Sequence, residues 1–200
     1  MLSRVSFVGL GSMGYPMASR LARQAGLLLH VHDANPATLA RFLQAHPTAR
    51  PAFDGPPVPT AASTTASTAA VTRRGDGEPH VVVLSLPGAD EVEDAIRRSP
   101  VIASLGEGSV VVDTSTVGPA CAAACSALLS QRRVRLVNAP VTGEASRAAD
   151  GTLTVIASGS ADAFREPFVA SLLATFGSKV VWAGDRPGAA QLAKAINNAL

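Results

Sequence analysis

Three glycines near the N-terminus are spaced in a way that suits contact between the backbone and a phosphate group. They lie in the segment Gly9-Leu10-Gly11-Ser12-Met13-Gly14 of a 200-residue sequence. The first glycine permits a tight turn, the second lets a pyrophosphate approach the backbone, and the third lets a following helix pack closely on a strand. The N-terminus of that helix would add free N–H groups and a partial positive charge. The segment is therefore a candidate dinucleotide-binding loop, and an ordinary tight turn is the alternative.

Asp33 is the acidic residue that such a loop requires. It follows Gly14 by 19 residues and ends an expected strand at residues 27–32. A carboxylate there can accept hydrogen bonds from both hydroxyls of an adenosine ribose, and it repels a 2′-phosphate. Residues 34–36 contain no arginine that could pair with such a phosphate. We therefore predict NAD as the cofactor, with NADP as the weaker ligand. A helix cap is the alternative role for Asp33.

A second candidate site lies near the other end of the chain, in Lys194-Ala195-Ile196-Asn197-Asn198. On a helix, Lys194 and Asn198 share a face, and Asn197 lies near the same edge. A lysine on a mostly apolar helix, flanked by alanines, could be partly shielded from water. Such shielding would lower its pKa and suit it to proton transfer. A solvated surface lysine is the alternative.

The turn Thr142-Gly143-Glu144 is a third candidate, because it follows an expected strand that leads into Asn138-Ala139-Pro140. Open α/β folds bind ligands in turns at the carboxyl ends of their strands. Thr142 offers a hydroxyl group, and its neighbours offer backbone N–H groups suited to a carboxylate. A turn without any function is the alternative.

Strands and helices alternate along the chain, and this order must bring the candidate residues to one sheet. Strands are expected at 4–8, 27–32, 80–86, 109–112, 134–138, 153–158 and 179–182, and helices at 16–23, 36–45, 90–97, 119–130, 161–173 and from about 188. The alternation predicts an α/β fold of Rossmann type, doubly wound, with helices on both faces of a mostly parallel sheet. A stretch rich in proline, serine and threonine, about 47–79, is expected to be a surface excursion.

Composition argues against several classes of partner. The net charge of +2 is too small to indicate a nucleic-acid partner. No apolar run approaches the roughly 20 residues of a membrane span, and the N-terminus lacks a signal-peptide pattern. We therefore expect a cytoplasmic protein. The two cysteines, Cys121 and Cys125, would share a helix face, which predicts buried thiols in a reducing compartment and no metal site.

Six segments, in order, resemble the β-hydroxyacid dehydrogenases, a family that includes 3-hydroxyisobutyrate dehydrogenase, tartronate semialdehyde reductase and L-threonate dehydrogenase. The segments are residues 9–18, Leu86-Pro87, Asp113-Thr114-Ser115-Thr116, residues 138–143, Gly151-Thr152-Leu153, and Gly188 through Lys194 to Asn198. The resemblance covers nearly the whole chain. It also overturns the alternative that Lys194 is merely a solvated surface residue.

The resemblance implies a reversible, NAD-dependent oxidation of a small 3-hydroxy acid to its semialdehyde. In that reaction Lys194 would exchange a proton with the substrate oxygen, and Asn198 would orient the substrate. Thr142 and Gly143 would bind its carboxylate. The family pattern further implies that Leu86 and Pro87 contact the cofactor together with the glycine loop, and that Thr116 lies beside the nicotinamide.

The sequence also departs from the family pattern. Thr142 replaces a serine, Glu144 replaces a glycine, and Ala190 replaces a common glycine; the first two hint at a polyhydroxy acid such as threonate. The family continues into an all-helical domain that closes the substrate pocket and supports dimerisation, whereas this sequence ends at residue 200. We therefore expect an NAD-binding domain at 1–186 and the start of an interdomain helix at 187–200. A homo-oligomer is expected if the helical domain exists, and a catalytically silent dinucleotide-binding module is the alternative function.

Overall fold

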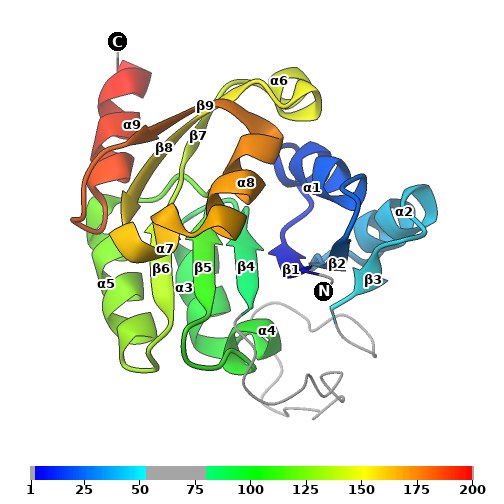
Figure 1. Ribbon diagram of the computed structural model, residues 1–200, viewed down its shortest axis with the longest axis horizontal. Coiled ribbons are helices and arrows are strands. Elements are labelled where there is room, and N and C mark those ends of the chain that lie inside the picture. Colours follow the sequence, from blue (N-terminus) through cyan, green and yellow to red (C-terminus); the bar gives the residue numbers. More distant parts are fainter. Residues whose placement is uncertain (1–2, 53–79, 200) are drawn as a thin grey trace.

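The structure, a computed structural model, describes residues 3–52 and 80–199 (Figure 1). Most of the expected excursion lies outside the described residues. The strands are β1 (Ser3–Val8), β2 (Leu27–His32), β3 (Arg50–Pro51), β4 (Val81–Leu84), β5 (Val110–Asp113), β6 (Arg135–Asn138), β7 (Val141–Thr142), β8 (Leu153–Gly159) and β9 (Gly177–Trp182). The helices are α1 (Gly14–Ala22), α2 (Pro36–Ala45), α3 (Ala89–Arg98), α4 (Pro100–Ala103), α5 (Pro119–Ser130), α6 (Ala145–Asp150), α7 (Ala161–Arg165), α8 (Pro167–Phe176) and α9 (Ala189–Ala199).

The strands form one sheet in the order β3-β2-β1-β4-β5-β6-β8-β7, with β9 paired to β8. The pairs from β3 to β6 are parallel, while β8 runs antiparallel to both β6 and β7. The predicted, mostly parallel sheet is therefore confirmed. From β1 the chain moves outward to β2 and β3 and then returns to the other side of β1 as β4. In such folds the ligand crevice opens at the carboxyl ends of the strands where the direction reverses.

Helices cover both faces of this sheet (Figure 1). An apolar layer lies on each face. On β4, Val83 points into the layer that includes residues of α1, α2, α6 and α8. Its neighbours Val82 and Leu84 point into the layer that includes residues of α3, α4 and α5. Strands buried on both faces read as continuous apolar runs, which is why β4 and β5 could be recognised from sequence. The doubly wound arrangement is confirmed.

Several short elements differ from the expectation. The predicted helix over 161–173 is two helices, because Pro167 disfavours helical backbone at the preceding residue and Glu166 has φ −60° and ψ 129°. The helices α4 and α6 and the strand β7 were not predicted. Within the stretch assigned to the excursion, residues 50–51 instead pair with β2 as β3.

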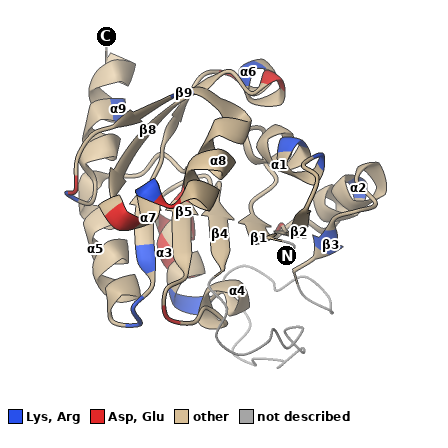
Figure 2. Cartoon of the chain, viewed as in Figure 1, with Lys and Arg blue, Asp and Glu red and all other residues tan. Residues whose placement is uncertain are grey.

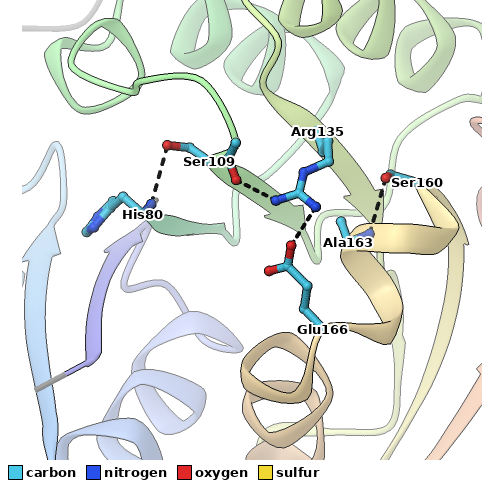
Figure 3. Close-up of polar contacts among 7 residues, drawn as sticks. His80, Ser109, Arg135, Ser160, Ala163 and Glu166 are labelled. Atoms are coloured by element: carbon cyan, nitrogen blue, oxygen red, sulfur yellow. Dashed lines mark hydrogen bonds and ion pairs between the residues drawn. The ribbon is translucent and has the colours of Figure 1, made fainter. Parts of the chain in front are cut away.

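Two arginines join distant parts of the fold. Arg135 at the start of β6 lies between the carbonyl of Gly108 and Glu166 at the α7–α8 junction, with Nη1 to Oε1 at 2.5 Å (Figure 3). Arg20 of α1 donates from Nη1 to the Ala149 carbonyl at 3.0 Å and from Nε to the Thr175 carbonyl. Through Arg20, the helix after the glycine loop is fastened to α6 and α8.

Candidate functional site

A cavity of about 1040 Å³ opens at the carboxyl ends of β1, β2 and β4. The whole glycine loop, residues 9–14, lines it, together with Asp33, Leu86 and Pro87. The structure thus brings together all the predicted cofactor-binding residues except Thr116. The cavity lies where the order of strands in the sheet reverses, and its size suits a large ligand.

The start of α1 faces this cavity without a capping side chain. Its N-cap residue, Met13, makes no side-chain cap hydrogen bond, and its first turn contains no acidic residue. A Cβ atom at Gly11 would meet nothing within 4 Å, so the loop backbone is open to the cavity at that point. Free N–H groups at a helix N-terminus form a ready site for an anion. The residues present therefore fit the pyrophosphate of a dinucleotide.

The Asp33 carboxylate holds the glycine loop against β2. Its Oδ2 accepts a hydrogen bond from the Leu10 amide at 2.6 Å, and its Oδ1 accepts one from the Asn35 amide at 2.8 Å. Asn35, and not Asp33, caps α2, because its side chain accepts from the amides of Ala37 and Thr38. Each carboxylate oxygen keeps a second lone pair with which it could accept from a ribose hydroxyl.

Lys194 is the single charged residue of α9 (Figure 2), and it is 8% exposed. Its Nζ donates to Thr142 Oγ1 at 3.0 Å, so the structure brings these two candidate residues together. Burial lowers the pKa of the Lys194 amine from its ordinary value. The shielding does not come from both flanking alanines, as the sequence suggested, because Ala195 is exposed. It comes from the packing of α9 on β8 and from the contact with β7.

Other candidate residues are not drawn into this contact. Asn197 and Asn198 are exposed, and the hydrogen bonds described for residues 80–199 include none between Asn198 and Lys194. Gly143 and Glu144 are also exposed in the turn before α6. Glu144 is the N-cap residue of that helix but makes no cap hydrogen bond through its side chain. The roles of Asn198 and Gly143 remain predictions.

Thr116 lies in the loop after β5 and does not line the cavity, but this loop is hydrogen-bonded to Leu86, which does. Ser115 Oγ accepts from the Leu86 amide at 2.9 Å, so this loop is fastened to the cofactor-side loop after β4. The side chain of Gln191 in α9 bonds to the backbone on both sides of Thr116. Gln191 was missed from the sequence, although it stands three residues before Lys194 and so shares its helix face.

A family model described as the NAD binding domain of 6-phosphogluconate dehydrogenase matches residues 4–184. The chain belongs to this family. It is 32% identical over 200 residues to the NAD-dependent L-serine dehydrogenase of Pseudomonas aeruginosa, covering 100% of this chain and 59% of that protein. The resemblance to β-hydroxyacid dehydrogenases is therefore confirmed, over about three fifths of that relative's length.

Solved structures agree with this NAD-binding domain assignment. A 3-hydroxyisobutyrate dehydrogenase from Salmonella typhimurium gives a TM-score of 0.74 at 30% identity, over 98% of this chain and 61% of that one. A protein named Psf3, in complex with NADP+ and 2-OPP, gives 0.78 at 28% identity, over 97% of this chain and 61% of that one. Structures similar to this NAD-binding domain thus include one with the phosphorylated dinucleotide.

Asp113 is a buried carboxyl group at the end of β5 in this NAD-binding domain. It is 2% exposed, and burial raises its pKa from 3.8 to about 6, against the opposing effect of hydrogen bonds from Ser115. The amide of Ser115 donates to Asp113 Oδ1 at 3.0 Å. The carboxyl therefore shapes the start of the loop that carries Thr116.

We expect Asp113→Asn to change how stability depends on pH. The folded chain holds this proton more tightly than the unfolded chain, so the wild-type free energy of unfolding should fall as pH rises from about 4 to about 6, by about 2 kcal/mol. The asparagine cannot ionise but keeps the oxygen that Ser115 bonds. The difference in unfolding free energy, variant minus wild type, should therefore rise across this range in urea denaturation. A difference that stays constant from pH 4 to pH 7 would contradict the burial argument.

The described residues contain no helix long and apolar enough to cross a membrane. Cys121 and Cys125 lie on one face of α5, as expected, with their sulfur atoms 3.9 Å apart and not joined.

Proposed function

We propose that this chain is the cofactor-binding and proton-transfer part of an NAD-dependent dehydrogenase that acts on small 3-hydroxy acids. The contact between the buried Lys194 amine and Thr142 carries the proposal. Oxidation of an alcohol requires a base, and a lysine with a lowered pKa is suited to that role. Lys194 also lies beside the turn expected to bind the substrate carboxylate. The names of the similar dehydrogenases support this class of reaction.

Four residues have separate roles in the proposed reaction. Lys194, as a neutral amine, takes the proton of the substrate hydroxyl, and as an ammonium it returns the proton in the reverse direction. Thr142 holds the amine through Oγ1 and, with Gly143, binds the substrate carboxylate. Asn198 orients the substrate from the next turn of α9. When bound, NAD supplies the acceptor for the hydride.

We also propose that residues 187–200 begin an interdomain helix. Leu192 and Ile196 are four residues apart on α9, and each is 55% exposed. An apolar pair at this spacing forms one exposed helix face. For a longer protein that includes the helical domain, we also propose a homo-oligomer.

We expect Asp33 to determine the choice of cofactor. Wild type should bind NAD more tightly than NADP, because the carboxylate repels the 2′-phosphate. An Asp33→Asn variant removes the charge but keeps one oxygen as an acceptor. Its NAD affinity should fall by about tenfold to a hundredfold, and its preference for NAD over NADP should shrink. Calorimetric titration with both dinucleotides measures this. Tighter binding of NADP by wild type would show that Asp33 does not select NAD.

Turnover of purified protein tests the whole proposal. L-serine, 3-hydroxyisobutyrate and L-threonate would each be mixed with NAD and the absorbance of NADH followed, with a 2-hydroxy acid of similar size as the control. We expect reduction of NAD with at least one of the three and none with the control. If NAD binds but no 3-hydroxy acid is oxidised at any concentration, this chain is a silent dinucleotide-binding module by itself.

A further inference from the structure

Gln191 is a buried polar residue that joins α9 to the loop after β5. Its side chain is 1% exposed. Its Nε2 donates to the Ser115 carbonyl at 2.9 Å, and its Oε1 accepts from the Val117 amide at 3.1 Å. The side-chain amide thus donates one hydrogen bond to the loop and accepts another, as the backbone of a neighbouring strand would. Its nitrogen and its oxygen are therefore both fixed. Thr116 lies between the two bonded backbone groups.

The other side-chain anchors described for α9 reach different strands. The Gly188 amide donates to Asn138 Oδ1 at 3.2 Å, and the Ala190 amide donates to Ser158 Oγ at 3.0 Å. These bonds hold the start of the helix against β6 and β8. Only the bonds of Gln191, among the side-chain hydrogen bonds described for residues 80–199, tie α9 to the loop that contains Thr116.

We propose that Gln191 is a positioning residue, which sets where the Lys194 amine lies relative to the loop carrying Thr116. The inference rests on the proposed function, in which a proton and a hydride leave the same carbon–oxygen unit of the substrate. Lys194 follows Gln191 by three residues, and its Nζ is held 3.0 Å from Thr142 Oγ1. A displacement of the helix by about 1 Å would break that hydrogen bond, and misplacement of this size can cost about a hundredfold in rate.

Two substitutions separate positioning from simple stabilisation. Gln191→Met keeps the length of the side chain and removes both hydrogen bonds, so kcat should fall at least about tenfold while the KM for NAD stays within about twofold. Gln191→Glu can both donate and accept when it is neutral, but when ionised it only accepts and faces the Ser115 carbonyl. Its kcat relative to wild type should therefore rise at least about tenfold from pH 9 to pH 6, while that of Gln191→Met stays constant.

Circular dichroism establishes which variants are folded. If Gln191→Met does not fold, the pH dependence of Gln191→Glu decides alone. Folded variants with wild-type kcat, or a Gln191→Glu ratio that does not change with pH, would overturn the positioning role.

Lysine titration gives a measurement that needs no turnover. The sequence contains two lysines, Lys179 and Lys194, so isotope-labelled lysine yields two side-chain signals. In Gln191→Met the pKa of Lys194 should move up toward its ordinary 10.5, because the displaced amine meets more water. The exposed Lys179 serves as the internal reference. If wild type shows no turnover but Lys194 responds to Gln191, the proposed function fails and the positioning role survives. An identical Lys194 titration in wild type and folded Gln191→Met overturns the positioning role.

Discussion

A Lys194→Met variant should lose at least about a hundredfold in kcat and keep its affinity for NAD. The substitution preserves an unbranched side chain of similar length but removes the amine that Thr142 holds. General acid–base groups contribute about 10² to 10⁴ in rate, and no second basic side chain is described in α9 to replace this one. NAD affinity should stay within about twofold, because the cavity lined by the glycine loop does not include Lys194. Steady-state kinetics and calorimetric titration give the two quantities.

Two matched variants sharpen this result. Lys194→Arg keeps a positive charge but cannot lose a proton near neutral pH, so it should be about as inactive as Lys194→Met. Lys179→Met alters the other lysine, which is exposed on β9, and should keep full activity. A Lys194→Met variant that retained a tenth or more of wild-type kcat would remove Lys194 from the chemistry.

Substitutions at two glycines of the glycine loop should also have large effects. The change at Gly14 should affect folding, and the change at Gly11 should affect NAD binding. A Cβ at Gly14 would lie 2.0 Å from the carbonyl oxygen of Gly9, which is backbone and cannot move aside cheaply. Gly14→Ala should therefore lower the free energy of unfolding by at least about 3 kcal/mol or prevent folding. A Cβ at Gly11 would meet nothing within 4 Å of the protein. Gly11→Ala should leave stability within about 1 kcal/mol and still weaken NAD binding at least about tenfold, because the methyl group occupies the space of the pyrophosphate.

Urea denaturation and NAD titration of both variants check this contrast. Equal stability for Gly14→Ala and wild type would show that the loop relaxes without cost. Unchanged NAD affinity in Gly11→Ala would show that the pyrophosphate does not approach the backbone at that glycine.

Most strands and helices of the fold could be predicted from sequence because their burial leaves a pattern of apolar residues. β4 and β5 are buried on both faces and appear as unbroken apolar runs. The helix α6 has six residues and β7 has two, too few for any period to show. The break between α7 and α8 is a different case. Pro167 was a local signal for it, and the apolar pattern across residues 161–173 concealed that signal.

The candidate site could be predicted where its residues stand in motifs whose spacing is recognisable in the sequence. The glycine loop, Asp33 and Leu86 do line one cavity, and Lys194 does contact Thr142. Gln191 could not be recognised in the same way, because a buried amide is defined by partners 76 and 74 residues away in the chain. The second function of Asp33, holding the Leu10 amide, could not be predicted either, because that contact exists only in the folded chain.

The attachment of Arg20 has a consequence for how this protein is made. Arg20 lies in the helix directly after the glycine loop, yet its guanidinium donates to the carbonyl of Thr175, 155 residues later. A nascent chain emerges from the ribosome N-terminus first, and contacts of such large sequence separation form late. The side of α1 that packs on α6 and α8 thus stays uncovered until both helices have been synthesised. Chains released before Phe176 should expose the apolar face of α1, and they should be targets for chaperones and proteases even though the whole glycine loop is already present.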